Sequence, residues 1–184
     1  MMLEFKNVSF RYAVDEFPMM ENLSFSVEEG DFVSIIGASG CGKSTIFRLI
    51  NGLEQLQKGE ILVNGKPIRE QKQYSAFMPQ KDLLFPWRTI EKNICLPMEL
   101  AGVPAAEQAK RCRDVLTQVG LLKYMKKYPK DLSGGMKQRV SFARTLLSGA
   151  DMLLLDEPFS ALDYLTRVEM QEWLLEQWEH YHKT

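Results

Sequence analysis

The stretch Gly37-Ala38-Ser39-Gly40-Cys41-Gly42-Lys43-Ser44-Thr45 decides how this 184-residue chain is interpreted. It follows an apolar run, residues 32–36, which predicts a strand, and it leads into a helical pattern over residues 46–50. Its glycines let consecutive backbone N–H groups point inward, and the helix N-terminus adds the positive end of its dipole. This spacing and context predict a phosphate-binding loop rather than a plain glycine turn. Lys43 is expected to reach the β- and γ-phosphates, and Ser44 to coordinate Mg²⁺.

A second apolar run ends in two carboxylates. Residues 152–155 read Met-Leu-Leu-Leu, which is typical of a strand buried on both faces of a parallel sheet. Ligands of such sheets bind at the carboxyl ends of the strands, where Asp156 and Glu157 follow. We therefore expect Asp156 to hold Mg²⁺ through water and Glu157 to act as general base toward an attacking water.

A second helix N-terminus suits an anion. Residues 132–139 read Leu-Ser-Gly-Gly-Met-Lys-Gln-Arg, and Ser133 is the expected N-cap of a helix that runs to Gly149. Each glycine in a first turn costs about 1 kcal/mol relative to alanine. Gly134 and Gly135 therefore indicate that another molecule approaches the backbone closely there.

The N-terminal third predicts antiparallel strands. Residues 3–12 alternate with one slip after Phe5, which indicates a bulged strand, and residues 23–27 alternate again. Asn64-Gly65 is typical of the turn in a hairpin over residues 59–68. Tyr12 ends the first strand, where its ring fits either the core or a stack on adenine, and the sequence leaves both open.

The middle of the chain is mostly helical, from Thr89 to Gly149. A helix is expected over residues 104–119, and another after an N-cap at Asp163. Just before this region, residues 83–87 read Leu-Leu-Phe-Pro-Trp and are unusually apolar for a loop. Such a loop either packs inward or forms a docking surface, and we favour docking.

Bulk composition narrows the class of protein. A net charge of −1 argues against avid nucleic-acid binding, and the longest apolar runs are far too short to span a bilayer. The three cysteines are widely spaced, which fits a reduced cytoplasmic setting. Cys41 is expected to serve the phosphate loop through its backbone rather than its thiol.

In this combination and order, the segments resemble the ABC-transporter ATPase family over essentially the whole chain. The matching segments are Walker A (Gly37 to Thr45), the Q-loop residue Gln80, the signature (Leu132-Ser133-Gly134-Gly135), Walker B (Leu155-Asp156-Glu157) and the D-loop (Ser160-Ala161-Leu162-Asp163). The resemblance implies an α/β fold: a P-loop NTPase core with a mostly parallel sheet, an N-terminal antiparallel β-subdomain and an inserted α-helical subdomain. The core would comprise residues 1–88 and 150–184, and the helical subdomain residues 89–149.

The same resemblance implies ATP and Mg²⁺ as ligands and ATP hydrolysis as the activity. Tyr12 then matches the adenine-stacking aromatic, and Gln80 would sense Mg²⁺ and the attacking water beside Glu157 and Lys43. The family works as a head-to-tail pair, in which one copy completes the phosphate site of the other. The residues implied to act in trans are Ser133, Gly134, Gly135 and Asp163.

By resemblance, the partners are a second copy, a transmembrane permease subunit and an extracytoplasmic substrate-binding protein, with no nucleic acid. The permease would contact residues 80–89, which places the chain at the cytoplasmic face of the membrane as a peripheral subunit. The Phe-Pro-Trp-Arg-Thr run and the Leu-Ser-Gly-Gly-Met signature are similar to those of nitrate, sulfonate and taurine importers. A soluble ABC ATPase of DNA repair or translation is the alternative, and it lacks the expected coiled-coil insertion or tandem domain.

Two departures from the family pattern affect these expectations. Met136 replaces the glutamine that usually follows the signature glycines. Family members also continue beyond the equivalent of Thr184 into a strand that ends in a switch histidine, and neither His180 nor His182 fits that place. We therefore expect a truncated domain with a gap in its central sheet, and hydrolysis by these residues alone is doubtful. A nucleotide-binding module with impaired hydrolysis is the corresponding alternative.

Overall fold

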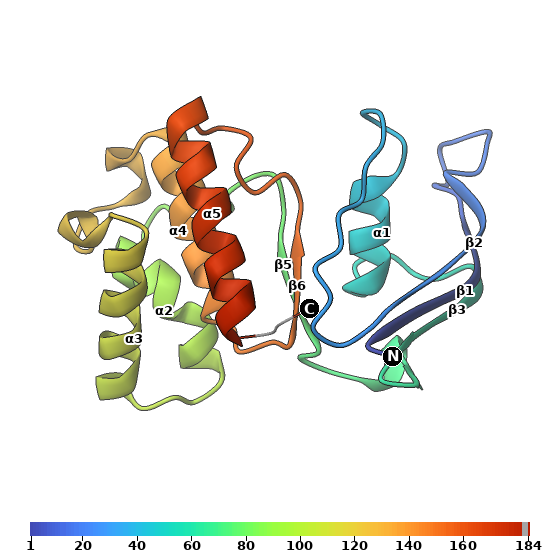
Figure 1. Ribbon diagram of the computed structural model, residues 1–184, viewed down its shortest axis with the longest axis horizontal. Coiled ribbons are helices and arrows are strands. Elements are labelled where there is room, and N and C mark those ends of the chain that lie inside the picture. Colours follow the sequence, from blue (N-terminus) through green and yellow to red (C-terminus); the bar gives the residue numbers. More distant parts are fainter. Residues whose placement is uncertain (182–183) are drawn as a thin grey trace. The chain divides into compact units, whose positions relative to one another are not determined.

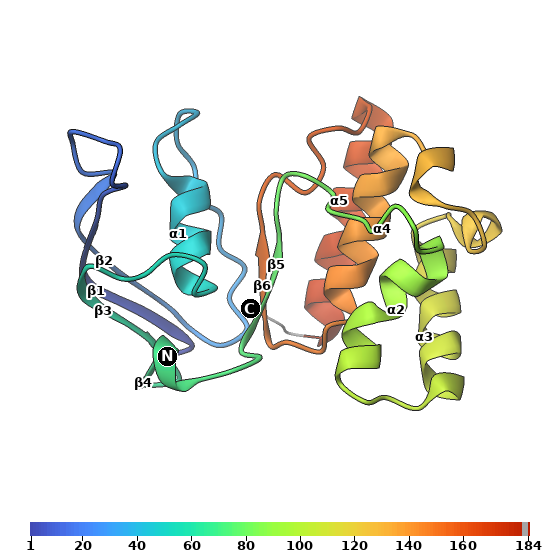
Figure 2. The same ribbon diagram turned by 180° about the vertical axis from the view of Figure 1, so that it is seen from behind.

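The computed structural model describes residues 1–181 and 184, apart from the side chains of Gln177, His180 and Tyr181. His182, which the sequence excluded as a switch histidine, lies outside the described residues. The chain forms two compact units (Figures 1 and 2). The first unit comprises residues 1–75 and 177–184, and the second comprises residues 76–176.

The first unit contains a four-stranded antiparallel sheet in the order β2-β1-β3-β4 (Figure 2). The strands are β1 (Leu3–Phe10), β2 (Met20–Val27), β3 (Lys58–Val63) and β4 (Lys66–Pro67). β3 and β4 form the predicted hairpin, because Asn64 and Gly65 both adopt positive φ angles, 50° and 72°. Such a pair of angles suits the right-handed twist of the strands that the turn joins. The antiparallel N-terminal sheet is therefore confirmed.

The predicted bulge in β1 is also confirmed. Pairing with β2 shifts register between Phe5 and Val8, and Asn7 adopts a φ of 51°. Gly59 of β3 passes so close to this bulge that an added Cβ would collide with the backbone carbonyls of Lys6 and Asn7. Glycine at position 59 therefore allows β1 to carry its bulge at the centre of the sheet.

The strand predicted over residues 32–36 is wrong. Residues 31–38 have no regular secondary structure, because no other described segment pairs with them, and a strand requires such inter-strand hydrogen bonds. The apolar side chains of this run are correspondingly exposed, by 47% at Phe32 and 93% at Ile36. Its start is anchored by Trp178, whose Nε1 donates to Gly30 O (2.9 Å) and whose ring meets Phe32 edge-on.

The second unit contains a pair of strands, β5 (Ser75–Met78) and β6 (Met152–Leu155). Asp156 N donates a hydrogen bond to Met78 O (2.9 Å). Met78 ends β5 and Asp156 directly follows β6, so the carboxyl ends of the two strands lie side by side. The two strands are therefore parallel, as expected for the strand before the paired carboxylates.

Helices make up most of the second unit (Figure 2). Its core is built where their apolar faces meet, and Phe142 lies at the centre, with edge-on contacts to Phe159 and Trp173. Of the described helices, none is long and apolar enough to cross a membrane. The α-helices are α2 (Ile90–Leu100), α3 (Ala105–Gln118), α4 (Gly134–Leu146) and α5 (Tyr164–Tyr181), and the 3₁₀ turns of the chain are Ile68–Glu70, Leu122–Tyr124 and Pro129–Asp131.

The helices expected near residues 104–119 and after Ser133 and Asp163 are thus present, with α4 ending three residues earlier than predicted. α2, α3 and α4 lie within the predicted helical insertion, residues 89–149, but their compact unit also includes the β5–β6 pair and most of α5. The subdomain limits drawn from the sequence stay a prediction.

Candidate functional site

The phosphate loop curls tightly before α1 (Lys43–Ile50) in the first unit. Gly42, the N-cap, adopts a φ of 97°, a left-handed conformation that side chains with a Cβ rarely adopt. An added Cβ at Gly37 would lie 2.6 Å from Cys41 Sγ, so a larger residue there would have to displace the Cys41 side chain. Both observations are those that the glycine spacing predicted.

Lys43 folds back over the loop that it follows. Its Nζ donates to Gly37 O (2.9 Å) and Ala38 O (2.8 Å), so the ammonium lies across the concave side of the turn. A phosphate carries full negative charge, whereas a carbonyl oxygen carries only a partial charge, so the ammonium interacts more strongly with a phosphate than with these two carbonyls. A phosphate in this loop would therefore compete well for the lysine.

Tyr12 lies beside the start of α1. Its hydroxyl shares a hydrogen bond with Thr45 Oγ1 (3.1 Å), and its half-buried ring meets Phe10 edge-on. This contact brings the tyrosine side chain to the last residue of the phosphate loop. Stacking on adenine stays a prediction.

Gln80 and Glu157 are brought together in the second unit, although 77 positions separate them in the chain. Gln80 Nε2 donates to Glu157 Oε2 at 2.8 Å, and both side chains are exposed. Glu157 adopts a φ of 50°, and a non-glycine residue in that region costs about 1–3 kcal/mol. In this backbone conformation, just past the end of β6, the Glu157 carboxylate accepts the hydrogen bond from the Gln80 side-chain amide.

The residues suited to Mg²⁺ lie on both units. Ser44 is exposed in the first turn of α1, and Asp156 is 8% exposed at the end of β6. Mg²⁺ usually keeps several waters and takes one or two carboxylates together with other oxygen ligands, so each of these side chains, taken by itself, is of a type that binds the ion. Binding of Mg²⁺ stays a prediction.

The signature segment opens α4 as the sequence predicted. Ser133 Oγ accepts a hydrogen bond from Met136 N (3.3 Å), which makes it the N-cap. The two glycines differ in their surroundings. An added Cβ at Gly134 would meet open space, whereas at Gly135 it would lie 2.7 Å from Leu162 Cδ2. Gly135 is therefore required by a contact within the chain as well as by any approaching ligand.

The segment after Glu157 is fastened to α4 by a buried glutamine. Gln138 Oε1 accepts from Ala161 N (2.9 Å), and its Nε2 donates to Ser160 Oγ (3.2 Å). Asp163 then caps α5, because its Oδ1 accepts from Thr166 N (3.1 Å). Hydrogen bonding by Thr166, first through its side chain and second through this backbone N–H, lowers the pKa of the Asp163 carboxyl below its usual value.

Alanine at the two signature glycines is expected to have opposite effects on stability. Gly135→Ala forces its methyl group into Leu162, which costs about 1–3 kcal/mol, and the gain in helix propensity of up to about 1 kcal/mol offsets only part of this, so the free energy of unfolding should fall. Gly134→Ala meets open space in a helix and should raise it by up to about 1 kcal/mol. Urea unfolding followed by circular dichroism measures both. Equal effects of the two variants would contradict the contact with Leu162.

The apolar loop that the sequence singled out is both packed and exposed. We call residues 82–89 the docking loop. Leu84 is buried (9% exposed), whereas Leu83 and Trp87 are 61% and 71% exposed. Leu84 therefore packs inward, while Leu83 and Trp87 stay available at the surface, and docking at these two residues stays a prediction.

Asn93 of α2 shapes the docking loop, and sequence analysis missed it. Its side chain is fully buried; Oδ1 accepts from Phe85 N (2.7 Å), and Nδ2 donates to the carbonyls of Phe85, Arg88 and Thr89 (3.0–3.1 Å). Arg144 of α4 holds the other end of the loop through Asp82 O and Leu83 O. The sequence did contain a signal for each residue. Asn93 is a polar amide among the apolar residues of its helix, and Arg144 is the single charged residue between Val140 and Leu147.

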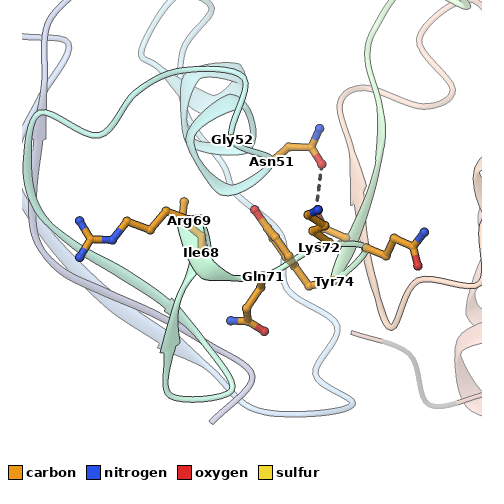
Figure 3. A pocket seen from close by; sticks show the side chains of 9 residues that line it. Asn51, Gly52, Ile68, Arg69, Gln71, Lys72 and Tyr74 are labelled. Atoms are coloured by element: carbon orange, nitrogen blue, oxygen red, sulfur yellow. Dashed lines mark hydrogen bonds between the residues drawn. The ribbon is translucent and has the colours of Figure 1, made fainter.

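A cavity of about 360 Å³ lies at the opposite end of α1 from the phosphate loop (Figure 3). Polar side chains around it link the end of α1 to the segment before β5. Ser75 Oγ donates to Asn51 Oδ1 (2.9 Å), and the Tyr74 hydroxyl donates to Ile50 O (2.5 Å). Burial raises the pKa of Tyr74. We therefore assign these side chains to stabilising the loop before β5.

The three thiols differ in accessibility. Cys41 is exposed on the phosphate loop, whereas Cys95 and Cys112 are buried between α2 and α3. A hydrogen bond with Cys95, together with burial, raises the pKa of Cys112, so its thiol stays protonated at neutral pH.

We expect iodoacetamide to label Cys41 in the folded protein at least about tenfold faster than the other two cysteines, because the thiolate is the nucleophile and needs access. Peptide mass spectrometry after timed labelling measures the three rates, and unfolding in urea should make them equal. Comparable rates in the folded protein would contradict the burial of the α2–α3 pair.

Comparison with known proteins agrees with this arrangement. The family described as "ABC transporter" matches residues 20–160. The chain is 40% identical over 165 residues to YtlC of Bacillus subtilis, an uncharacterized ABC transporter ATP-binding protein, with coverage of 90% of this chain and 64% of that protein. It is 44% identical over 161 residues to the aliphatic sulfonates import ATP-binding protein SsuB of Bacillus cereus, with coverage of 88% and 63%.

A third relative extends over the whole chain. The formylaminopyrimidine import ATP-binding protein ThiZ of Halalkalibacterium halodurans is 42% identical over 183 residues, which cover 100% of this chain and 71% of that protein. The chain spans just under two thirds of the length of YtlC and SsuB.

Among solved structures, the fold resembles the ATP-binding cassette MJ0796 in a dimeric post-hydrolysis state bound to ADP and Pi. The TM-score is 0.91 at 30% identity, with coverage of 100% of this chain and 85% of that one. Together with the glycine-rich loop, the signature helix and the paired carboxylates in this order, these matches show that the chain belongs to the ABC transporter family, as an ATP-binding cassette.

Proposed function

We propose that this chain is the ATP-binding subunit of an importer, and that it hydrolyses ATP in a head-to-tail dimer to drive uptake of a small solute. The observation that carries the proposal is the 2.8 Å contact between Gln80 and Glu157 at the end of β6, in a chain that also carries a glycine-rich loop closed by Lys43. Gln80 and Glu157 together can orient a water molecule and accept its proton, and the glycine-rich loop with Lys43 can bind a triphosphate.

Nucleotide binding falls to the first unit. The backbone N–H groups of residues 37–45 and the N-terminus of α1 would surround the phosphates, with Lys43 exchanging its two carbonyl acceptors for phosphate oxygens. Tyr12 would stack on adenine. Mg²⁺, held by Ser44 and through water by Asp156, would offset negative charge on the phosphates.

Hydrolysis falls to the carboxylate of Glu157. It would accept a proton from the water that attacks the γ-phosphorus, while Gln80 keeps the carboxylate and water oriented. Water attack breaks the bond between the γ-phosphorus and the bridging oxygen, and yields ADP and phosphate. Loss of the Glu157 negative charge should therefore affect turnover far more than binding.

A second copy would complete the site. Ser133, Gly134 and Gly135 present a helix N-terminus, and Gly134 has open space in front of it. Neither half-site alone neutralises the charge that develops on the γ-phosphate, whereas two facing copies would place a lysine and a bare helix start on the same anion. The dimeric state of the cassette MJ0796 supports this arrangement.

The docking loop would receive a membrane permease subunit, which would place the chain at the cytoplasmic face of the membrane. Exposed Leu83 and Trp87 on a loop held rigidly by Asn93 form an apolar surface of the kind that binds another protein. The relatives SsuB and ThiZ are named for the import of two different organic solutes, so the solute would be selected by the permease and an extracytoplasmic binding protein.

The experiment that tests this function is purification of the protein from membranes with a tag on this chain. We expect a multi-span membrane protein to copurify, and the Trp87→Ser variant to lose it while still binding MgATP. Absence of a membrane protein, or association with a soluble DNA-repair or translation complex instead, would overturn the transport assignment. Retention of the membrane protein by Trp87→Ser would exclude Trp87 from the contact.

A further inference from the structure

Arg144 forms an unusual attachment between the signature helix and the docking loop. It lies in the last turn of α4, where one guanidinium nitrogen donates to Leu83 O (2.9 Å) and the other to Asp82 O (3.0 Å). The second nitrogen also contacts Ser141 Oγ (3.4 Å). One side chain of α4 thus holds two consecutive peptide groups of a loop about 60 positions away in the sequence.

The surroundings of Arg144 indicate that it positions the loop backbone rather than forming a surface ion pair. The guanidinium is half-buried, and burial lowers the pKa of Arg144 while the nearby Asp82 carboxylate raises it. Its near acceptors are main-chain carbonyls, which fix the direction of the loop backbone rather than the position of another side chain. Arginine suits this use because its planar fork presents several donors in a fixed geometry.

The loop backbone at this point is in an uncommon conformation. Leu83 adopts a φ of 44°, which disfavours any residue with a Cβ, and Asp82 Oδ1 accepts from Leu84 N (3.1 Å). The turn directs Leu84 into the core and Leu83 outward. Arg144 holds the carbonyl of the strained residue itself, so it stabilises the turn that exposes the docking surface.

The two ends of α4 reach different functional segments. At its start lie Ser133 and the signature glycines, and Gln138 holds the segment after Glu157. At its end Arg144 holds the loop that begins two residues after Gln80. The 13 residues of α4 form a rigid rod of about 20 Å, since an α-helix rises about 1.5 Å per residue.

We infer that Arg144 is a positioning residue that makes the docking loop and the signature helix α4 move as one body. A displacement of Leu83 and Trp87 by a bound partner is then passed along α4 to Ser133 and Gly134, and closure around a nucleotide at those residues is passed back to the loop. The inference rests on the proposed function for its two ends, while the attachment itself rests on the two hydrogen bonds of Arg144.

Hydrogen exchange of the full protein, followed by mass spectrometry, tests the attachment. Arg144→Met removes both hydrogen bonds, and Arg144→Lys keeps the charge but cannot reproduce the fork. We expect amides of residues 82–85 to exchange about tenfold faster or more in both variants, which corresponds to the loss of roughly 1.4 kcal/mol of local stability. Arg139→Met is the matched control, because Arg139 is a half-buried arginine of the same helix that donates to Val119 O (3.0 Å), away from the loop.

Addition of MgATP tests the transmission. In the wild-type protein we expect MgATP to slow exchange at residues 37–45 and 133–136 and to change it at residues 82–85. In Arg144→Met the first two responses should persist and the third should disappear. Unchanged exchange of residues 82–85 in Arg144→Met without nucleotide, or equal loss of the third response in Arg139→Met, would overturn the inference. If MgATP changes exchange at neither residues 37–45 nor residues 133–136 of the wild-type protein, the proposed function is refuted instead. The attachment by Arg144 would still be tested by the exchange of residues 82–85 without nucleotide.

Discussion

Replacing Lys43 with alanine is expected to weaken ATP binding by about 10- to 100-fold and to abolish measurable hydrolysis. A charge-assisted hydrogen bond contributes about 1.5–3 kcal/mol, and each 1.4 kcal/mol corresponds to a factor of ten in affinity. The Nζ that now donates to Gly37 O and Ala38 O would no longer be available for the phosphates. Isothermal titration calorimetry with MgATP measures the binding, and release of phosphate measures the hydrolysis.

The fold should tolerate this change. The carbonyls of Gly37 and Ala38 are exposed, so water replaces the lysine, and the free energy of unfolding should change by less than about 0.5 kcal/mol. Lys66→Ala, which removes an exposed lysine from the hairpin of the same unit, is the matched control and should leave ATP affinity unaltered. Equal affinities of Lys43→Ala and wild type would contradict the phosphate-loop assignment.

Replacing Glu157 with glutamine is expected to slow hydrolysis by about 10²–10⁴-fold, the range typical of a lost general base, while ATP binding is retained. Glutamine has nearly the same shape, and its carbonyl oxygen still accepts the hydrogen bond from Gln80 Nε2, so the strand end should keep its conformation. Because ATP is bound but not cleaved, a dimer that depends on ATP should accumulate on gel filtration.

Two comparisons make the Glu157→Gln result specific. Glu169→Gln, at an exposed position of α5, should retain hydrolysis and should form no lasting dimer. Adding the Lys43→Ala change to Glu157→Gln should abolish the dimer, because it removes nucleotide affinity. Wild-type turnover by Glu157→Gln would exclude this carboxylate as the base.

The sequence by itself was enough to predict which residues form the site and what chemistry they would perform. Glycine spacing, the helix start at Ser133 and the two carboxylates after an apolar strand are local patterns, and each depends on the conformational preferences of a few neighbouring residues. The bulge in β1 and the Asn64-Gly65 hairpin were predictable for the same reason. The family, and with it the α/β fold, followed from the order of these local segments.

The tertiary structure decided what depends on residues far apart in the chain. The run 32–36 has the composition of a strand but forms none among the described residues, because composition cannot supply the neighbouring strand that its hydrogen bonds require. Gly135 is needed for its contact with Leu162, and Gln80 reaches Glu157 only because β5 and β6 pair. Asn93 and Arg144 carry no local signal of their roles, since a buried amide or guanidinium acquires its function only from the backbone groups that folding places around it.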